Sequence, residues 1–278
     1  MDAWRRFRAH KPAMVGLVIL SLYTILAIIA PWVTPYDPVQ QNLVASLQTP
    51  SAEHWLGTDQ LGRDVFTRIL YGTRISLLIG VAAVAFGMII GVPLGVVSGY
   101  YGRSTDMIIQ RLADIMFSFP SILLALALVA VLGVGLQNVI IAVGIAVVPI
   151  FIRLVRSQVL AVREEVYVDA ALVIGSRDLR ILWHHVLANS WAPIIVQATV
   201  SLGITILVAA GLGFLGLGIQ APTPEWGSML GEGRNYIYSH PHMTTFPGLA
   251  IFLAVLAFNL MGDGLRDALD PRMRAFEA

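Results

Sequence analysis

The sequence predicts an all-α integral membrane protein with six transmembrane helices and with both termini in the cytoplasm. Three observations support this fold class. The 278 residues are 57% hydrophobic and only 13% charged, with a mean hydropathy of +0.76, which lies well outside the usual balance of soluble domains. Long uncharged runs recur along the chain, and the basic residues are concentrated on one side of them.

The composition excludes several chemistries. The chain has no cysteine, so it forms no disulfide, thiolate metal site or cysteine nucleophile. Its single lysine, Lys11, follows His10 rather than a glycine-rich loop, so the chain has no phosphate-binding P-loop and does not hydrolyse ATP by that route. The net charge of +1 gives no indication of a nucleic-acid partner, and none is expected.

The first uncharged run covers residues 12–36 and is long enough to cross about 30 Å of hydrocarbon as a helix. A signal peptide is the alternative, but the run is longer than an ordinary signal core and ends in Ala-Pro-Trp without an A-x-A cleavage pattern. A retained span is therefore predicted, preceded by the basic residues Arg5, Arg6, Arg8 and Lys11.

Residues 37–74 are predicted to form an extracytoplasmic loop, because Pro, Asp, Gln and Ser are frequent up to about Gln60. Phe66, Ile69 and Leu70 then follow at i, i+3 and i+4, which predicts a short amphipathic helix near the membrane interface. A plain helix start is the alternative interpretation of this spacing.

The second uncharged run, 75–102, carries five glycines at near-helical spacing, which predicts close helix packing in lipid. A short polar and partly helical loop is expected after it, over about 103–114. The third run, 115–152, would be about 57 Å long as one helix and must fold back. The motif LGVGLQN, with Gly133 and Gly135, is the natural place for that turn.

A fifth span is predicted over 193–220 and a sixth over 246–262, joined by a proline-rich outer loop. Six spans put both termini on one side, and 14 of the 18 basic residues fall in segments on that side. The positive-inside rule makes it the cytoplasm. The predicted organisation is thus a first segment 1–36, an outer loop 37–74, a transmembrane core 75–264 and a cytoplasmic tail 265–278.

The longest charged interval, 161–191, lies on the cytoplasmic side and follows a helix, stop, helix pattern. Gly175 stands where a helix needs a left-handed exit residue, and Ser176 is placed to cap the next helix with Asp178 near its positive end. A docking hairpin is one interpretation and an ordinary interhelical loop is the other. The residues at helical spacing before the stop are Tyr167, Ala170, Ala171 and Ile174.

The uncharged runs disfavour an ion-coupled carrier, which usually needs an intramembrane carboxylate or basic group. Asp114 and Asp263 lie only at the ends of the predicted spans. His240 and His242 have an H-x-H spacing that could share a ligand, but without a recognisable third ligand no metal site is predicted. No catalytic residues are assigned.

The segment VDAALVIGSRDLRILWHHVLANSWAP resembles the EAA loop of permease subunits of binding-protein-dependent ABC importers. In that family the loop carries the coupling helix that sits in a groove of the ATPase subunit. The sequence departs from the family pattern at Asp169, where Glu is usual, and at Ala188, where Pro is usual. The matching residues are Asp169, Ala170, Ala171, Gly175 and Leu187.

Three further stretches, beginning at His54, Phe214 and Phe246, resemble the second membrane subunit of dipeptide, oligopeptide and nickel importers, and the resemblance spans about 32–272. It implies a type I ABC importer permease in the bacterial inner membrane, whose first helix wraps a second, different permease. It also implies two cytoplasmic ATPase subunits that hold ATP and magnesium and an extracytoplasmic solute-binding protein. The chain itself is expected to be non-catalytic and without a cofactor.

The implied function is import of dipeptides or oligopeptides, with nickel or a glutathione-like compound as alternative substrates. A membrane anchoring or assembly protein and an autonomous channel are the alternatives from other classes. The residues expected to couple the chain to its ATPases are Glu164, Glu165, Asp169, Ala170, Ala171, Gly175, Ser176, Arg177, Asp178 and Leu187.

Overall fold

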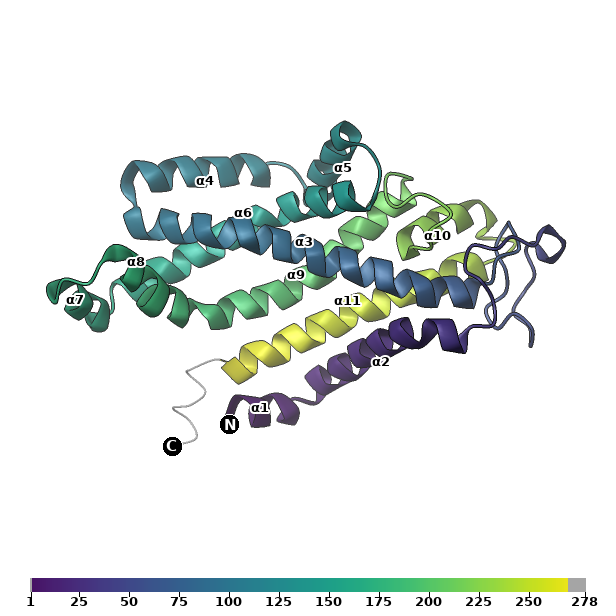
Figure 1. The fold of residues 1–278 in the computed structure, drawn as a ribbon, viewed down its shortest axis with the longest axis horizontal. Helices are drawn as coiled ribbons and strands as arrows, with labels where there is room; N and C mark the ends of the chain where they lie inside the picture. Colours follow the sequence, from purple (N-terminus) through teal and green to yellow (C-terminus); the bar gives the residue numbers. More distant parts are fainter. Residues whose placement is uncertain (1, 270–278) are drawn as a thin grey trace.

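The computed structural model describes residues 2–269, and helices dominate this range (Figure 1). The long helices are α2 (Lys11–Val33), α3 (Val65–Tyr101), α6 (Leu136–Arg163), α9 (Ala188–Phe214) and α11 (His242–Leu269). The shorter elements are α1 (Asp2–Ala9), η1 (Leu43–Ala45), α4 (Arg103–Phe117), α5 (Ser121–Leu132), α7 (Val166–Val173), α8 (Asp178–Ile181), the π-helical turn η2 (Leu182–Leu187), α10 (Trp226–Gly233) and η3 (Arg234–Tyr236).

The chain passes along the bundle six times, which confirms the six-span, all-α fold class. The five long helices are each apolar and long enough to cross a membrane, and the bent pair α4 and α5 gives the sixth when it is counted as one broken span. The start of α1 and the end of α11 lie near the end of the bundle that carries α7 and α8, and the loop before α3 lies with α10 at the other end (Figure 1).

The third pass differs from the prediction. Residues 103–114, expected to be a short and partly helical loop, belong entirely to helix α4, which continues to Phe117. The expected span from residue 115 is broken after Phe117 and bent by 91°. Pro120 disfavours a helical conformation for the residue before it and lacks the N–H that would continue the helix. The fold-back in LGVGLQN is confirmed, with Gly133 at φ +90° and Gly135 at φ +132°.

The predicted interfacial helix before the second span was wrong, and the alternative of a plain helix start was right. Residues 65–74 are the first turns of α3, which runs for 37 residues without a break. Asp64 caps this helix by accepting hydrogen bonds from the backbone N–H and the hydroxyl of Thr67, at 2.8 and 2.7 Å. At about 1.5 Å per residue, α3 is longer than the bilayer is thick.

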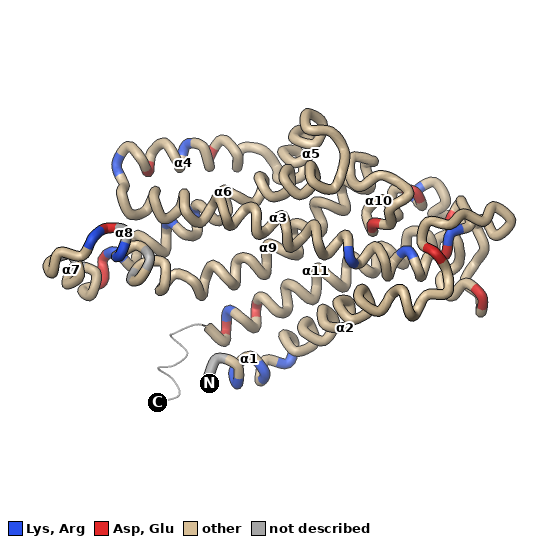
Figure 2. The backbone as a smooth tube through the Cα atoms, in the orientation of Figure 1, with Lys and Arg blue, Asp and Glu red and all other residues tan. Residues whose placement is uncertain are grey.

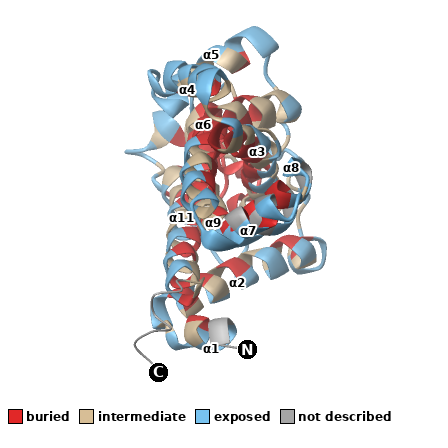
Figure 3. Ribbon diagram, turned by 90° about the vertical axis from the view of Figure 1, so that its left-hand side faces the viewer, coloured by how far each residue is buried: buried red, intermediate tan, exposed pale blue. Residues whose placement is uncertain are grey.

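The centre of the bundle is the contact between α3 and α6, where the buried residues gather (Figure 3). Gly87, Gly91, Gly95 and Gly99 recur every four residues and form one face of α3. A Cβ built on Gly91 would lie 2.7 Å from both the carbonyl oxygen of Val148 and the Cβ of Phe151. The glycines therefore bring the two backbones together, as their spacing predicts.

Candidate functional site

The α7–α8 hairpin, residues 164–187, joins α6 to α9 and projects from one end of the bundle (Figure 1). Acidic and basic residues cluster on it (Figure 2). Glu164 and Glu165 are exposed and form the turn between α6 and α7, where the backbone N–H of Glu165 donates to Val162 and its carbonyl accepts from Val168. The hairpin is thus a separate water-facing unit held at the ends of two long helices.

Gly175 ends α7 in the left-handed conformation that its position predicts, with φ +80°. The N–H of Ser176 donates to the carbonyl of Ala171 at 3.0 Å, which completes a Schellman turn. No atom lies within 4 Å of a Cβ built on Gly175, so the requirement for glycine is conformational rather than spatial.

The second short helix starts one residue later than predicted. Asp178 is the first residue of α8, so Arg177 occupies the capping position that the sequence suggested for Ser176. The carbonyl of Arg177 accepts from the N–H groups of Arg180 and Ile181 at 2.9 and 3.1 Å. The placement of Asp178 in the first turn of α8 is confirmed.

The two alanines of the motif lie on different faces of α7. Ala171 is buried with Val168 in a cluster that includes the ends of α6 and α9. Ala170 is exposed. The side chain of Asp169 lies outside the described part of the structure.

The exposed face of α7 is apolar. Val166, Val173 and Ile174 are 81%, 87% and 81% exposed, and with Ala170 they follow the spacing i, i+4, i+7 and i+8. We call these four residues the α7 stripe. An apolar stripe on a segment beyond the membrane spans is the pattern of a docking surface.

The hairpin is fixed to the bundle at both ends. The hydroxyl of Tyr100, at the end of α3, donates to the carboxylate of Asp178 at 3.0 Å, and Arg163 donates to the carbonyl of Tyr100 at 2.9 Å. Leu187 is buried at the last position of the π-helical turn. Ala188, the departure from the family's proline, is helical, so this turn runs directly into α9 without a break.

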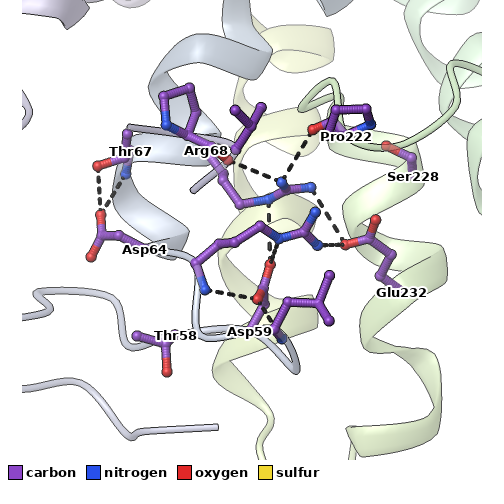
Figure 4. A network of polar contacts seen from close by, with 12 residues as sticks. Thr58, Asp59, Asp64, Thr67, Arg68, Pro222, Ser228 and Glu232 are labelled. Carbon is purple, nitrogen blue, oxygen red and sulfur yellow. Dashed lines mark hydrogen bonds and ion pairs between the residues drawn. The ribbon is translucent and has the colours of Figure 1, made fainter. Parts of the chain in front are cut away.

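The opposite end of the bundle is closed by an ion-pair network (Figure 4). Arg63 donates to Asp59 and to Glu232 at 2.6 Å each. Arg68 lies 3.4 Å from Glu232 and 3.5 Å from Asp59 and also donates to the carbonyl of Pro38 at 3.2 Å. Both guanidinium side chains are 1% exposed. This outer network joins the loop before α3 to α10, a link that the sequence analysis missed.

The outer histidines do not form a joint site. His242 is buried and its Nε2 lies 3.1 Å from the carbonyl oxygen of Thr58, whereas His240 is beside Ser239 and Tyr236. Among the side chains that the structure describes, no group of three or more His, Asp or Glu residues could hold a metal ion. His242 therefore serves to hold the outer loop against α11.

Glu225 is a buried carboxylate at the start of α10. It is 2% exposed, and it accepts from the N–H groups of Gly227 and Ser228 at 2.8 Å each and from the hydroxyl of Ser76 at 3.1 Å. Burial raises the pKa of Glu225 above its ordinary value, and these three hydrogen bonds only partly oppose the effect.

The raised pKa of Glu225 predicts a pH-dependent stability. The folded protein holds this proton more tightly than the unfolded chain, so the contribution of Glu225 to stability is fully present below about pH 4.5 and is lost as the pH rises through the folded-state pKa. We expect the wild type to lose stability as the pH rises, whereas Glu225→Gln should not. The melting temperature of the variant, measured on the purified protein complex, should therefore increase relative to that of the wild type. An equal difference at every pH would contradict this assignment.

The charges of α4 and α6 correct the prediction of uncharged spans. That prediction holds for the apolar runs but not for the helices, because α6 continues to Arg163 and contains Arg153 and Arg156. Arg156 makes two hydrogen bonds to Asp106 of α4, at 2.6 and 2.7 Å, and Arg153 donates to Asp114 at 2.6 Å.

These contacts place three polar side chains of α4 against its neighbouring helices. Asp106, Gln110 and Asp114 lie at i, i+4 and i+8 and face α3 and α6, where Gln110 donates to Ser98 at 2.9 Å. Ile109 and Ala113 of α4 are buried with Val148 and Ile152 of α6. Four other apolar side chains are 56–64% exposed: Met107, Ile108, Leu112 and Ile115. The outer face of α4 therefore suits lipid or another membrane subunit.

Comparisons with known proteins agree with this architecture. Residues 91–275 match the family of binding-protein-dependent transport system inner membrane components, and residues 1–50 match the N-terminal transmembrane domain of oligopeptide transport permease C. The chain is 54% identical over 274 residues to the dipeptide transport system permease protein DppC of Alkalihalophilus pseudofirmus, covering 99% of this chain and 90% of that one.

Two further similarities extend the comparison. The glutathione transport system permease protein GsiD of Pectobacterium atrosepticum is 49% identical over 276 residues, covering 99% of this chain and 91% of that protein. An inward-facing structure of the MetNI methionine ABC transporter has the same fold, with a TM-score of 0.62 at 19% identity over 74% of this chain and 98% of that one.

The fold and the projecting hairpin define a multi-pass permease of the bacterial inner membrane. The chain belongs to the family of binding-protein-dependent transport system inner membrane components, and it is a permease subunit of an ABC importer.

Proposed function

We propose that this chain forms half of the translocation path of a dipeptide importer and that separate ATPase subunits drive it. The 54% identity to a dipeptide permease over nearly the whole of both chains supports the substrate class. Glutathione is the second candidate, because a glutathione permease is 49% identical over a similar length.

The proposal for coupling rests on the exposed α7 stripe. Val166, Val173 and Ile174 expose apolar surface beyond the spans, and a folded partner that covers them would gain their burial free energy. The proposed partner is a cytoplasmic ATPase subunit that binds ATP and magnesium, since this chain has no P-loop. Closure of two such ATPases would move the hairpin and hence α6 and α9.

The proposed roles of the other residues follow from their positions. Glu164, Glu165, Arg177 and Asp178 flank the α7 stripe and would form the polar rim of the contact. Asp169 is proposed to make a polar contact with the ATPase. Ala170 permits a close approach, and Ala171, Ser176 and Leu187 hold the hairpin in shape.

Further partners are proposed for the remaining surfaces. The outward face of α2 exposes Val18, Ile25 and Ile28 by 53–61%, which suits the second permease. The end of the bundle closed by the outer network is proposed to receive the solute-binding protein.

Replacing Gly175 with valine tests the coupling proposal. A β-branched residue at φ +80° is strained by about 1–3 kcal/mol, so the turn after α7 should change its angle. We expect dipeptide uptake by membrane vesicles to fall by about 5- to 150-fold, because a strain of that size changes the population of the native turn by such a factor. The amount of assembled importer should stay unchanged, because no atom lies within 4 Å of the new Cβ.

Gly175→Asn is the matched control, because asparagine tolerates the left-handed conformation. It should retain most of the uptake. Normal uptake by Gly175→Val at normal importer levels would contradict the coupling role of the hairpin.

A further inference from the structure

We infer that Arg153 and Asp114, together with the apolar cavity beside Phe117, bind the charged main chain and one side chain of a dipeptide within the translocation path. This inference rests on the proposed import of dipeptides. It assigns the substrate contact to particular residues of this chain.

The ion pair lies beside the later, cytoplasmic half of the uncharged run of α3. Gly91 of α3 faces Val148 and Phe151, and Gly95 faces Ile152 and Val155. Arg153 is therefore level with the part of α3 between these glycines, inside its uncharged run 75–102. Charges on helices of a transmembrane bundle are costly unless they face water or protein, and they commonly mark a substrate pathway.

Both side chains of the pair are accessible in this chain. Arg153 is 50% exposed and Asp114 is 51% exposed, although they are only 2.6 Å apart. Since lipid would not solvate them, the exposed side of the pair faces water or the partner permease. In the neighbouring pair, Arg156 and Asp106 are less exposed, at 33% and 21%, and two hydrogen bonds join them.

The guanidinium of Arg153 is held in a fixed orientation. Its central carbon lies 4.2 Å from the centroid of the Phe117 ring, and one of its terminal nitrogens donates to Asp114. A planar guanidinium with five N–H donors can bind a carboxylate through two of them while it keeps such a contact. Asp114 provides the acceptor for an ammonium group.

The cavity completes the site. It has a volume of about 250 Å³ and is enclosed by the break between α4 and α5, by α6 and by α9. Phe117 forms part of its wall and contacts Arg153, and Ile150 lines it one turn before Arg153 on α6. Its lining is mostly apolar, with Ser121 and Thr205 as the hydroxyl-bearing side chains.

The arrangement matches one class of ligand. A cation, an anion and an apolar cavity lie side by side, and a dipeptide carries a carboxylate, an ammonium group and apolar side chains. Opposite charges next to Phe117 in the wall of the cavity would orient such a zwitterion, whereas a neutral apolar solute would make no use of them.

The first test uses the complete importer, reconstituted in liposomes with its partner subunits and binding protein, and radiolabelled leucyl-leucine. Arg153→Gln should lower kcat/KM for uptake by about 10- to 100-fold, the effect of losing a charge-assisted contact to the substrate. Arg153→Lys should recover part of the loss. Arg156→Gln is the matched control and should lower the yield of the complex while uptake per assembled complex stays within about threefold.

The second test separates substrate binding from a purely structural ion pair. Because the chain has no cysteine, Ile150→Cys introduces a unique thiol in the cavity. Leucyl-leucine should slow labelling of this thiol by a water-soluble maleimide during turnover, and Arg153→Gln should abolish that protection. The charge-reversed pair Arg153→Asp with Asp114→Arg should keep the complex assembled without restoring uptake.

Equal protection with and without Arg153, or full uptake by the charge-reversed pair, would overturn the inference while leaving dipeptide import intact. Absence of leucyl-leucine uptake by the wild-type importer would instead overturn the proposed function. The inferred dipeptide site at Arg153 and Asp114 would then be overturned as well.

Discussion

Replacing Gly91 with alanine is expected to prevent accumulation of the folded permease. The new Cβ would lie 2.7 Å from the carbonyl oxygen of Val148 and from the Cβ of Phe151. Neither atom can move aside by a side-chain rotation, so α3 and α6 must separate. We expect a loss of about 3 kcal/mol, at the upper end of the usual cost of overpacking. The amount of importer in membranes and its melting temperature measure this loss.

Gly203→Ala is the matched control, because it makes the same chemical change in the long helix α9. The nearest atoms to its Cβ would be those of Val255 at 3.5 Å, an ordinary contact. This variant should be as stable as the wild type, or more stable by about 0.5–1 kcal/mol, since alanine favours a helix over glycine. Equal stability of the Gly91 and Gly203 variants would contradict the close packing of α3 on α6.

Replacing Arg63 with glutamine is expected to open the outer end of the bundle. Asp59 and Glu232 would each lose a hydrogen bond of 2.6 Å to the guanidinium. Their remaining side-chain contacts would be the longer ones to Arg68, at 3.5 and 3.4 Å, and Asp59 would also keep its hydrogen bonds from the backbone N–H groups of residues 61 and 63. Removing one partner from a buried ion pair typically costs about 3–5 kcal/mol. The melting temperature of the complex and the protease sensitivity of residues 37–64 should both report the change.

Two further variants sharpen this prediction. Arg234→Gln replaces an exposed arginine in the same outer region and should change stability by less than about 0.5 kcal/mol. Glu232→Gln should cost less in the Arg63→Gln background than in the wild type, because the two residues interact directly. Strictly additive effects would show that the ion pair between them contributes nothing to stability.

The local features of the fold could be predicted from the sequence. The apolar runs predicted the six passes, because the cost of placing charge in lipid acts on each segment separately. Gly133 and Gly175 marked two turns correctly, since a positive φ is a property of single residues. The glycine face of α3 likewise followed from spacing alone. The resemblance of the EAA segment and of three other stretches indicated the family, to which the chain belongs.

The errors arose where boundaries depend on neighbouring helices. Residues 103–114 contain enough charge to suggest a short and only partly helical loop, yet residues 103–117 form one helix, α4, in which Asp106 and Asp114 pair with arginines of α6. The signal for this helix was the spacing i, i+4 and i+8 of Asp106, Gln110 and Asp114. That spacing predicts a polar stripe but does not say that the stripe faces inward.

The sequence by itself thus determined the class of protein, the number of passes and the position of the projecting hairpin, because hydropathy and turn conformation are encoded locally. Only the tertiary structure decided which charges meet. Arg63 and Glu232 are 169 residues apart, and Arg153 and Asp114 are 39 apart. Such pairs form because helix packing brings distant segments together, and packing depends on all the helices at once.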